Sequence, residues 1–447
     1  MTLIRVSEQG ADFITSAPRT ASRALWLPLF WMVLCGSRSI NQWLNPPHYS
    51  TLRTEAQYLE ATLTGSPIDR LVLSLAIGCG LVILYRRRAA AAELFRNSKP
   101  LIAFTFYWAV TVLWSDIGEV SFKRWVRLLG NLVMAAILMT ETDPFGAVRI
   151  VFRRAAYLLI PLSVVLIKYF PHIGILYIRK GEVLWIGVAL MKNGLGLLSF
   201  VMALFLIWDT TSAWKHSAEK PRARLIFNIV VIAMSLWLLK GPGGNHSSAA
   251  LSCLVVGVII LMALRTPMIK RRFHHLGILA VSITCVYLML DATFGVTEFI
   301  VVDVLGRNMT FTDRVPLWNM LVDLGQKRPL LGYGYGAFWT PERVAQIDDN
   351  LTQSHNGYLD VFLEGGVLAI ALLGILLLSV FNNIRKHGAV DYECAVLRLS
   401  FLATILLANV TESALANERD LLTFVFYVIA LSYGIPYARA LQTRLAA

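Results

Sequence analysis

The segment SHN at residues 354–356 holds the side chain in this sequence that is best suited to acid–base chemistry. A histidine exchanges a proton near neutral pH, so His355 is a candidate general base for deprotonating a hydroxyl group. It precedes a long apolar run, and the amide groups at the N-terminus of such a helix attract anions. A histidine at a helix end can also be purely structural. Glu364 inside that run and Glu412 at the end of the next run favour a functional role, because acids at such depths normally have partners.

A second group of residues is suited to binding phosphate. In the segment GRNMTFTDR, residues 306–314, Arg307 and Arg314 lie on either side of two threonines. Planar guanidinium groups bind phosphate through paired hydrogen bonds, and threonine hydroxyls add neutral donors. We therefore expect both arginines to hold a phosphate or pyrophosphate group. The pattern alone is weakly specific, since arginines are common in exposed loops.

The motif GYGYGAFW at residues 332–339 combines glycines with aromatic rings. It is not a phosphate-binding P-loop, because no Lys-Ser/Thr pair follows it. Glycines let the backbone turn tightly and approach a ligand. The rings of Tyr333, Tyr335 and Trp339, together with the amide of Asn356, are candidates for binding a glycan. The alternative is an aromatic belt at a membrane–water interface.

Basic residues also interrupt apolar runs. Arg124, Arg127 and Asn131 are spaced so that they share one face of a helix. A doubly basic stripe facing lipid would be costly, so we expect this face to meet other helices or a wet cavity. Lys192 interrupts a second run in the tripeptide KNG. It is either a lysine that reaches the interface at a helix break or a cation presented by an unwound helix.

The composition shows what kind of protein positions these side chains. Of the 447 residues, 56% are hydrophobic and 15% are charged, against roughly 25% charged in an average soluble domain. Apolar runs recur that approach or exceed the roughly 20 residues needed to span a bilayer. These features exclude a soluble enzyme, a disordered chain and a fibrous repeat. They predict an all-α polytopic membrane protein, with residues 1–447 forming a single integral membrane domain.

Charge and cysteine usage agree with that class. The formal net charge of +13 is interpreted as cytoplasmic anchors, with no nucleic acid as a partner and the lipid bilayer as the surrounding medium. The five cysteines form no CxxC pair, so neither a zinc site nor a disulfide framework is expected. The first apolar run lacks an A-x-A cleavage site and is expected to be retained as a helix.

We expect about twelve transmembrane helices, each of about 20 residues. The predicted spans are 24–40, 69–85, 100–116, 122–140, 155–170, 184–208, 225–240, 246–264, 276–294, 357–381, 395–412 and 420–438. With the N-terminus inside, the inner loops hold about 23 Lys and Arg residues and the outer loops about 9. Both termini are therefore predicted to be cytoplasmic.

The connection 295–356 is by far the longest outer loop in this arrangement, and long ordered loops are usually functional. Within it, apolar residues recur at helical spacing, namely Leu317, Met320, Leu321 and Leu324. Thr312 or Asp313 is the expected N-cap. We interpret this segment as an amphipathic helix lying on the outer membrane surface.

Taken in order, GRNMTFTDRVPLW, RPLLGYGYGAFW and SHNGYLDVFLEGGVLA resemble the O-antigen ligase and Wzy-type polymerase superfamily. The match is similar to the ExoQ-like exopolysaccharide polymerase branch and is sharpest over residues 306–370. The resemblance implies a GT-C-like glycosyltransferase with one large periplasmic loop in the bacterial inner membrane. Its active site would be periplasmic.

Such enzymes transfer a glycan from undecaprenyl pyrophosphate to an acceptor sugar hydroxyl, on another glycan or on lipid A-core. The resemblance implies no metal, no cofactor and an inverting reaction. It assigns His355 as the catalytic residue of the HN motif and Arg307 and Arg314 as pyrophosphate ligands. Lys192, Arg124 and Arg127 are further candidates for the pyrophosphate site.

The motifs leave two alternatives open. Within the enzyme interpretation, an O-antigen ligase and a polymerase are both compatible with the motifs, and the form of GRNMTFTDRVPLW slightly favours a polymerase. Outside it, a polysaccharide transporter or flippase would also have about twelve spans and intramembrane charges. Transporters commonly show matching broken helices in two repeated halves, whereas the unusual residues here cluster around one outer loop.

Overall fold

The structure is a computed structural model. It describes residues 22–45, 66–177, 183–216, 222–243, 247–275, 277, 295, 314–347, 353–388, 391–415 and 417–431. Arg307, the proposed N-cap residues Thr312 and Asp313, and nearly all of the predicted span 276–294 lie outside the described residues.

The described part of the chain is helical, with one two-stranded antiparallel sheet. The elements in order are η2 (Arg23–Leu25), α1 (Trp26–Gly36), α2 (Ile40–Leu44), α4 (Pro67–Arg86), α5 (Arg88–Asn97), α6 (Lys99–Thr111), η3 (Val112–Trp114), α7 (Gly118–Met139), α8 (Pro144–Tyr169), α9 (Pro171–Gly174), β1 (Ile175–Tyr177), β2 (Val183–Trp185), α10 (Lys192–His216), α11 (Arg222–Lys240), α12 (Ser248–Leu264), α13 (Pro267–Arg271), η4 (Phe273–His275), α16 (Arg314–Gly325), α17 (Pro341–Ile347), α18 (Gly357–His387), α19 (Tyr392–Thr411) and α20 (Leu421–Leu431).

Six of these helices are long and apolar enough to cross a membrane: α4, α8, α10, α11, α18 and α19. Four shorter apolar helices accompany them, over Arg23–Gly36, Lys99–Trp114, Ser248–Leu264 and Leu421–Leu431. Every predicted span outside 276–294 is occupied at least in part by a helix. The protein is therefore an all-α polytopic membrane protein.

The predicted start of the span 184–208 is wrong. β1 and β2 pair antiparallel, with Ile175 opposite Trp185, and α10 begins only at Lys192. The turn between β2 and α10 contains Gly187 at φ +52°. Arg38, which is 1% exposed, donates hydrogen bonds to carbonyl oxygens of this region, including that of Ala189 at 3.0 Å. An apolar segment can thus leave the helical conformation inside the protein because a buried guanidinium satisfies its carbonyls.

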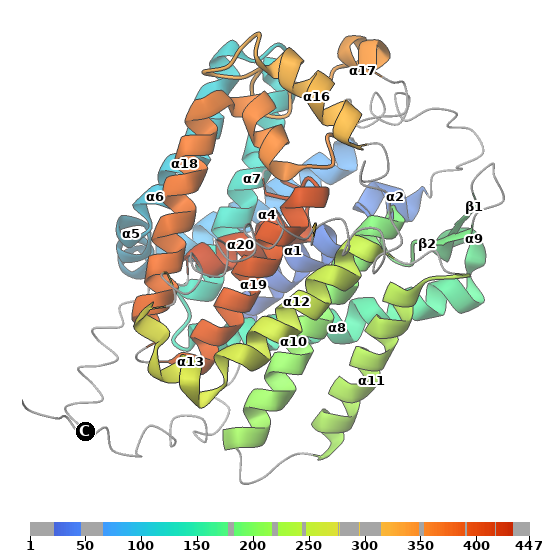
Figure 1. Cartoon of the computed structure of the whole chain (residues 1–447), viewed down its shortest axis with the longest axis vertical. Helices are drawn as coiled ribbons and strands as arrows, with labels where there is room; N and C mark the ends of the chain where they lie inside the picture. The colour runs from blue at the N-terminus through green and yellow to red at the C-terminus, as the bar shows by residue number, and fades with distance from the viewer. Residues whose placement is uncertain are drawn as a thin grey trace, which may run out of the picture.

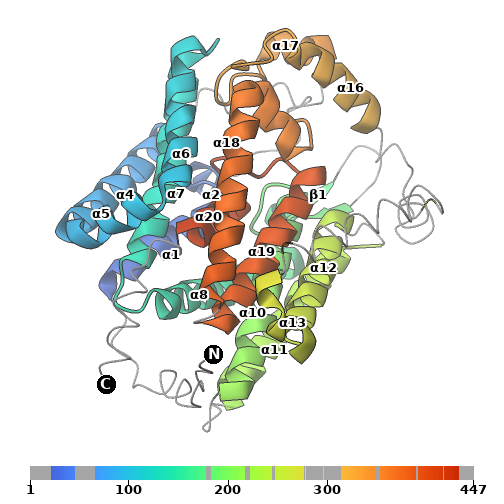
Figure 2. The same ribbon diagram turned by 60° about the vertical axis from the view of Figure 1, so that its left-hand side comes forward.

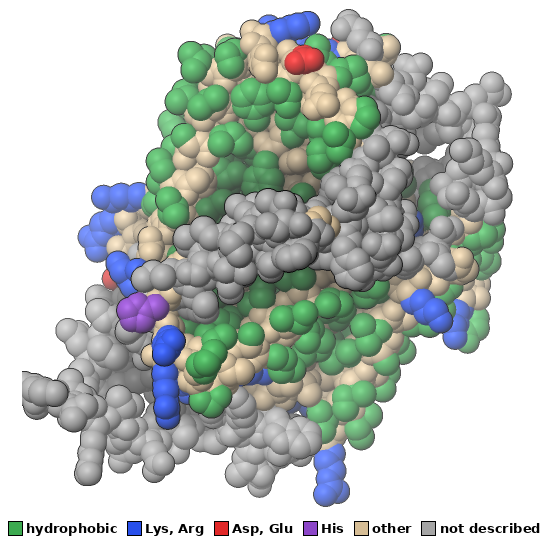
Figure 3. Space-filling view, viewed as in Figure 1, with side chains coloured by type: hydrophobic (Ala, Val, Ile, Leu, Met, Phe, Trp, Pro, Cys, Tyr) green, Lys and Arg blue, Asp and Glu red, His purple; other side chains and the backbone are tan. Residues whose placement is uncertain are grey.

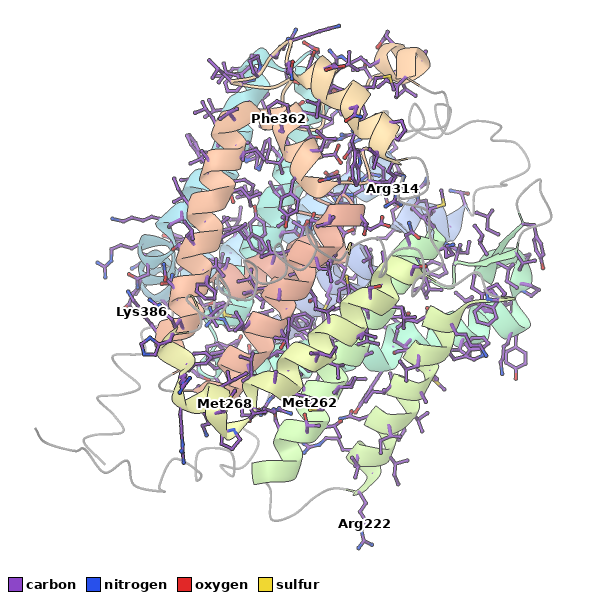
Figure 4. All side chains as sticks on the ribbon, in the orientation of Figure 1. Arg222, Met262, Met268, Arg314, Phe362 and Lys386 are labelled. Atoms are coloured by element: carbon purple, nitrogen blue, oxygen red, sulfur yellow. The ribbon has the colours of Figure 1, made fainter. Side chains whose placement is uncertain are left out.

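The two ends of the bundle are formed by different elements. α16 and α17 lie together at one end, beside the start of α18, whereas α13 lies at the opposite end (Figures 1 and 2). Arg314 and Phe362 are in the upper part of the view in Figure 4, and Arg222 and Lys386 lie below them. Hydrophobic side chains dominate the described surface between the ends (Figure 3), as expected for helices that face lipid.

α18 is broken close to its N-terminus. Gly366 has φ 65° and ψ −166°, which is not helical, and a Cβ at this position would lie 2.2 Å from the carbonyl oxygen of Leu330. The loop before α17 fills the break. The amides of Tyr333 and Gly334 donate to the carbonyls of Leu363 (3.0 Å) and Glu364 (2.8 Å). Backbone groups freed by the broken helix therefore have protein partners, which the interior of a membrane requires.

Candidate active site

His355 lies at the N-terminal mouth of α18 in an unusual backbone conformation. Its φ of 53° makes it the only non-glycine residue with positive φ in the described part of the chain. Asn356 is the N-cap of α18, and its Oδ1 accepts hydrogen bonds from the amides of Tyr358 (3.1 Å) and Leu359 (3.2 Å). The indole of Trp318 donates to the carbonyl of Ser354 at 2.9 Å. The turn is thus fixed on both sides, and left-handed backbone at a non-glycine residue is often found at functional sites.

Glu412 faces His355 from the end of α19. Glu412 Oε2 lies 3.9 Å from His355 Nδ1, with the two side chains 8% and 23% exposed. The distance allows electrostatic attraction but is too long for a hydrogen bond, and the buried Nδ1 has no hydrogen-bond partner among the described residues. The amide of Gly357 donates to the carbonyl of Glu412 at 3.1 Å, which ties the two helix ends together.

Two further side chains converge on the same carboxylate. Asn193 Nδ2 donates to Glu412 Oε1 at 2.9 Å from the start of α10. Arg314 Nη2, from the start of α16, lies 3.8 Å from Glu412 Oε1, and Arg314 also donates to the carbonyl of Thr411. We call His355, Glu412, Arg314 and Asn193 the His355 cluster.

The chemistry available to the His355 cluster is proton transfer next to positive charge. A carboxylate on the Nδ1 side orients an imidazole and makes its other nitrogen a better proton acceptor. Arg314 supplies a planar cation that is suited to phosphate oxygens. Lys192, the first residue of α10, is the direct neighbour of Asn193 and is half-buried. Among the predicted site residues, the structure thus brings together His355 and Arg314, which both approach Glu412.

Arg124 and Arg127 are placed against a different part of the protein. Arg124 Nη1 donates to the carbonyl of Gly336 at 2.7 Å, so it supports the glycine-rich loop. The Nε of Arg127 is buried without a hydrogen-bond partner in the described part of the chain. Asn131 shares their helix face but is structural, accepting from the indole of Trp31 at 2.7 Å. Among the described residues, no hydrogen bond or ion pair joins either arginine to the His355 cluster. Their role in pyrophosphate binding stays a prediction.

The aromatic rings of the GYGYGAFW motif are packed into the protein. Tyr333, Tyr335 and Trp339 are 6%, 1% and 4% exposed. The ring of Tyr335 lies 5.0 Å from that of Trp108, and Trp339 Nε1 donates to Asp360 Oδ1 at 3.3 Å. In this structure the rings stabilise the loop, and no face of Tyr335 is open to a sugar. Their assignment, with Asn356, to glycan binding stays a prediction.

Asp116 is a structural anchor that the sequence did not single out. It follows η3, and it accepts hydrogen bonds from Arg328, at 2.8 Å, and from Arg343. Burial raises the pKa of the Asp116 carboxyl, but the hydrogen bonds from Arg343 and Arg328 outweigh this effect and hold it below its usual range. Both arginines also lie over the ring of Tyr333. The carboxylate therefore links the two ends of the glycine-rich loop, through residues far away in the sequence.

Gly366→Ala is expected to destabilise the protein and abolish its activity. The backbone conformation at Gly366 is essentially restricted to glycine and would cost alanine about 1–3 kcal/mol, before the clash with Leu330 is counted. Gly374→Ala in the same helix is the matched control, since a Cβ there meets nothing within 4 Å. The measurement is thermal stability in detergent together with activity. Equal melting temperatures for the two variants would contradict the role assigned to the break.

One sequence comparison covers the region that contributes Arg314 and His355 to this site. Residues 233–374 match the family model described as O-Antigen ligase. This region includes α12, α16, α17 and the first part of α18, and hence Arg314 and His355. Asn193 and Glu412 lie outside it, so the His355 cluster is completed by helices on either side of the matched region.

A second comparison extends over most of the chain. The sequence is 22% identical over 362 residues to the "Exopolysaccharide production protein ExoQ" of Rhizobium meliloti (strain 1021), and the alignment covers 77% of this chain and 79% of that protein. Both findings agree with the motifs at residues 306–370. The resemblance of this chain to the O-antigen ligase and Wzy-type superfamily, with ExoQ as a distant relative, is therefore confirmed.

Proposed function

We propose that this protein is a membrane glycosyltransferase that joins a glycan from undecaprenyl pyrophosphate to an acceptor sugar hydroxyl. The observation that carries the proposal is the His355 cluster, in which an imidazole is paired with a carboxylate beside a guanidinium. It lies at the N-terminus of α18 and combines residues of the O-antigen ligase region with Asn193 and Glu412. The family match supports glycosyl transfer as the reaction class.

In the proposed reaction, the acceptor oxygen attacks the anomeric carbon of the donor glycan. The bond between that carbon and the pyrophosphate oxygen breaks, and the electron pair leaves with the lipid pyrophosphate. His355 takes the hydroxyl proton, and Arg314, with Lys192 and Arg307, neutralises the charge that grows on the leaving group. Attack from the side opposite the leaving group inverts the anomeric centre. These residues need no metal ion for the step.

The acceptor is proposed to be a growing exopolysaccharide chain. The ExoQ relative, named as an exopolysaccharide production protein, supports a polymerase. The family description supports the alternative, an O-antigen ligase that transfers the glycan to lipid A-core. Deletion in the source organism separates them. Loss of long exopolysaccharide with normal lipopolysaccharide is expected for the polymerase, and unsubstituted core for the ligase.

Purified protein in liposomes with a lipid-linked oligosaccharide tests the reaction itself. We expect glycans of increasing length and release of undecaprenyl pyrophosphate in the absence of added nucleotide and metal, with EDTA present. Movement of the lipid-linked glycan between leaflets without joining would identify a transporter instead. That outcome would overturn the enzymatic proposal.

We also propose about twelve spans in a GT-C-like arrangement, with both termini cytoplasmic and the His355 cluster at the periplasmic face of the inner membrane. The excess of Lys and Arg in the predicted inner loops supports this orientation. Reporter fusions at Arg87, Arg222, Arg271 and Arg385 are expected to report a cytoplasmic location, and one at Gly336 a periplasmic one. A cytoplasmic signal at Gly336 would contradict both the topology and the function.

A further inference from the structure

An apolar patch lies where α6, η3 and α18 meet the loop that leads into the glycine-rich motif. Leu113 and Leu330 are 84% and 65% exposed, and the other exposed members are Phe106, Leu331, Val367 and Leu368. We call these six residues the Leu330 patch. Hydrogen bonds join the segments that carry it, because the amide of Val367 donates to the carbonyl of Pro329 at 2.8 Å and Trp114 Nε1 donates to that of Leu331 at 3.2 Å. The patch is therefore one continuous surface.

Two segments of the chain change from charged to apolar at the border of the Leu330 patch. Arg328 precedes Leu330 by two positions, and Asp116 follows Trp114 by two. The charged members meet, since Arg328 Nη1 donates to Asp116 Oδ1 at 2.8 Å. The indole of Trp114 meets the apolar turn at the carbonyl of Leu331, and tryptophan is enriched at membrane–water interfaces. Segments far apart in the sequence thus place a polar–apolar boundary at one level.

The length of α18 agrees with a membrane surface at this level. Beyond the break at Gly366, the helix continues from Val367 to the basic residues Arg385 and Lys386 near its other end. At 1.5 Å per residue this part is about 28 Å long, close to the hydrocarbon thickness of about 30 Å. When its basic end lies at one membrane surface, Val367 and the Leu330 patch reach the other.

The backbone of residues 329–331 is equipped for an apolar environment. Its three carbonyl oxygens accept hydrogen bonds from the amides of Val367 (2.8 Å) and Leu368 (3.4 Å) and from the indole of Trp114 (3.2 Å). Pro329 has no amide hydrogen to satisfy. A loop in water needs no protein partners for its carbonyls, because water supplies them, whereas non-helical backbone at membrane depth does need them.

We propose that residues 329–331 and the rest of the Leu330 patch are inserted among the lipid acyl chains of the leaflet on the α16 side, with Asp116 and Arg328 at the level of the headgroups. Lipid is the expected occupant because the patch continues onto the flanks of α6 and α18, and hydrophobic side chains cover the described surface below the charged end of the molecule (Figure 3). The inserted turn is the one that fills the break in α18, so the glycine-rich loop is anchored in the membrane. The proposal depends neither on glycosyl transfer nor on the orientation of the chain.

Fluorescence quenching in liposomes provides the test. The fluorophore NBD is attached to Leu330→Cys or, as the matched control, to Lys327→Cys, each in the full-length chain with its five native cysteines replaced. Lys327 is exposed and lies in the same loop. We expect phospholipids with a nitroxide on the acyl chain to quench the probe at position 330, and quenching by aqueous iodide to be lost there. At position 327 iodide is expected to quench and the nitroxide lipid is not.

The other outcomes at position 330 overturn the proposal. Strong quenching by iodide would place the turn in water. Protection from both quenchers would show that protein covers the patch, as in a contact with a second copy of the chain.

Photolabelling tests the same proposal on the wild-type chain, without any substitution. A phospholipid with a diazirine on its acyl chain is activated in the liposomes, and the labelled residues are located by tandem mass spectrometry. We expect carbene insertion at Leu330 or Leu331, whereas residues 332–340 of the same tryptic peptide are buried and are expected to stay unlabelled. A protein labelled elsewhere but at neither leucine would overturn the proposal.

Discussion

His355→Ala is expected to lower glycan transfer by about 10²–10⁴-fold, the usual cost of losing a general base, while binding of the lipid-linked donor is retained. The reason is that His355 supplies the imidazole of the His355 cluster, whereas the expected donor ligands are cationic residues that remain. The measurement is the rate of glycan joining by purified protein, compared with retention of the labelled donor on the same preparation.

Because of the backbone conformation of His355, asparagine tests the role of its side chain more specifically than alanine does. Because the residue has φ 53°, alanine loses the imidazole and also strains the turn. Asparagine tolerates this conformation and keeps a hydrogen-bonding side chain, but it cannot accept a proton at neutral pH. We therefore expect His355→Asn to fold with wild-type stability and to be as inactive as His355→Ala. Substantial activity in His355→Asn would show that the histidine shapes the turn and is not the base.

Arg314→Ala is expected to reduce transfer by about ten- to hundredfold, since a charge-assisted contact to phosphate contributes about 1.5–3 kcal/mol. Arg314→Lys should restore part of the activity, because lysine keeps the charge and loses the paired donors. The steady-state rate at several donor concentrations measures the effect. Arg307→Ala is expected to behave in the same way. Lys327→Ala, which removes an exposed cation close to the same helix, is the control.

The contact between Arg314 and Glu412 raises a competing explanation that a double variant resolves. Arg314 could matter only because it offsets the charge of a carboxylate that is 8% exposed. In that case, Arg314→Ala would add no further loss of transfer to Glu412→Gln. If Arg314 binds the pyrophosphate, the double variant is more impaired than Glu412→Gln alone. Equal rates in Glu412→Gln and in the double variant would remove Arg314 from the donor site.

Glu412 lies close to both residues whose substitution is predicted to lower transfer, His355 and Arg314. It approaches His355, Arg314 and Asn193 from the end of α19, and its backbone carbonyl accepts from the amide of Gly357. The backbone carbonyl of this residue therefore holds the start of α18, and its carboxylate faces both the proposed base and a proposed phosphate ligand. A substituted carboxylate alters the orientation of all three side chains, so single-variant effects at this cluster should not be additive.

The sequence by itself determined the class of this protein and most of its helices. An apolar stretch of about 20 residues can satisfy its backbone in lipid only as a helix, so local composition predicts the ends of α4, α11 and α12 to within three residues. The sequence also indicated base and phosphate chemistry, because accepting a proton is a property of the His355 side chain itself and binding phosphate is a property of the Arg314 side chain itself.

Only the tertiary structure decided which of these residues meet. Asn193 and Glu412 are 219 positions apart and share a hydrogen bond, and no local pattern encodes that distance. The burial of Tyr335 against Trp108 depends likewise on how α6 packs beside the glycine-rich loop. The break at Gly366 is stable because the backbone of residues 329–334 supplies its hydrogen bonds. Hydropathy measures the transfer of single residues into lipid, whereas these contacts arise from helix packing that brings distant polar groups together in the interior.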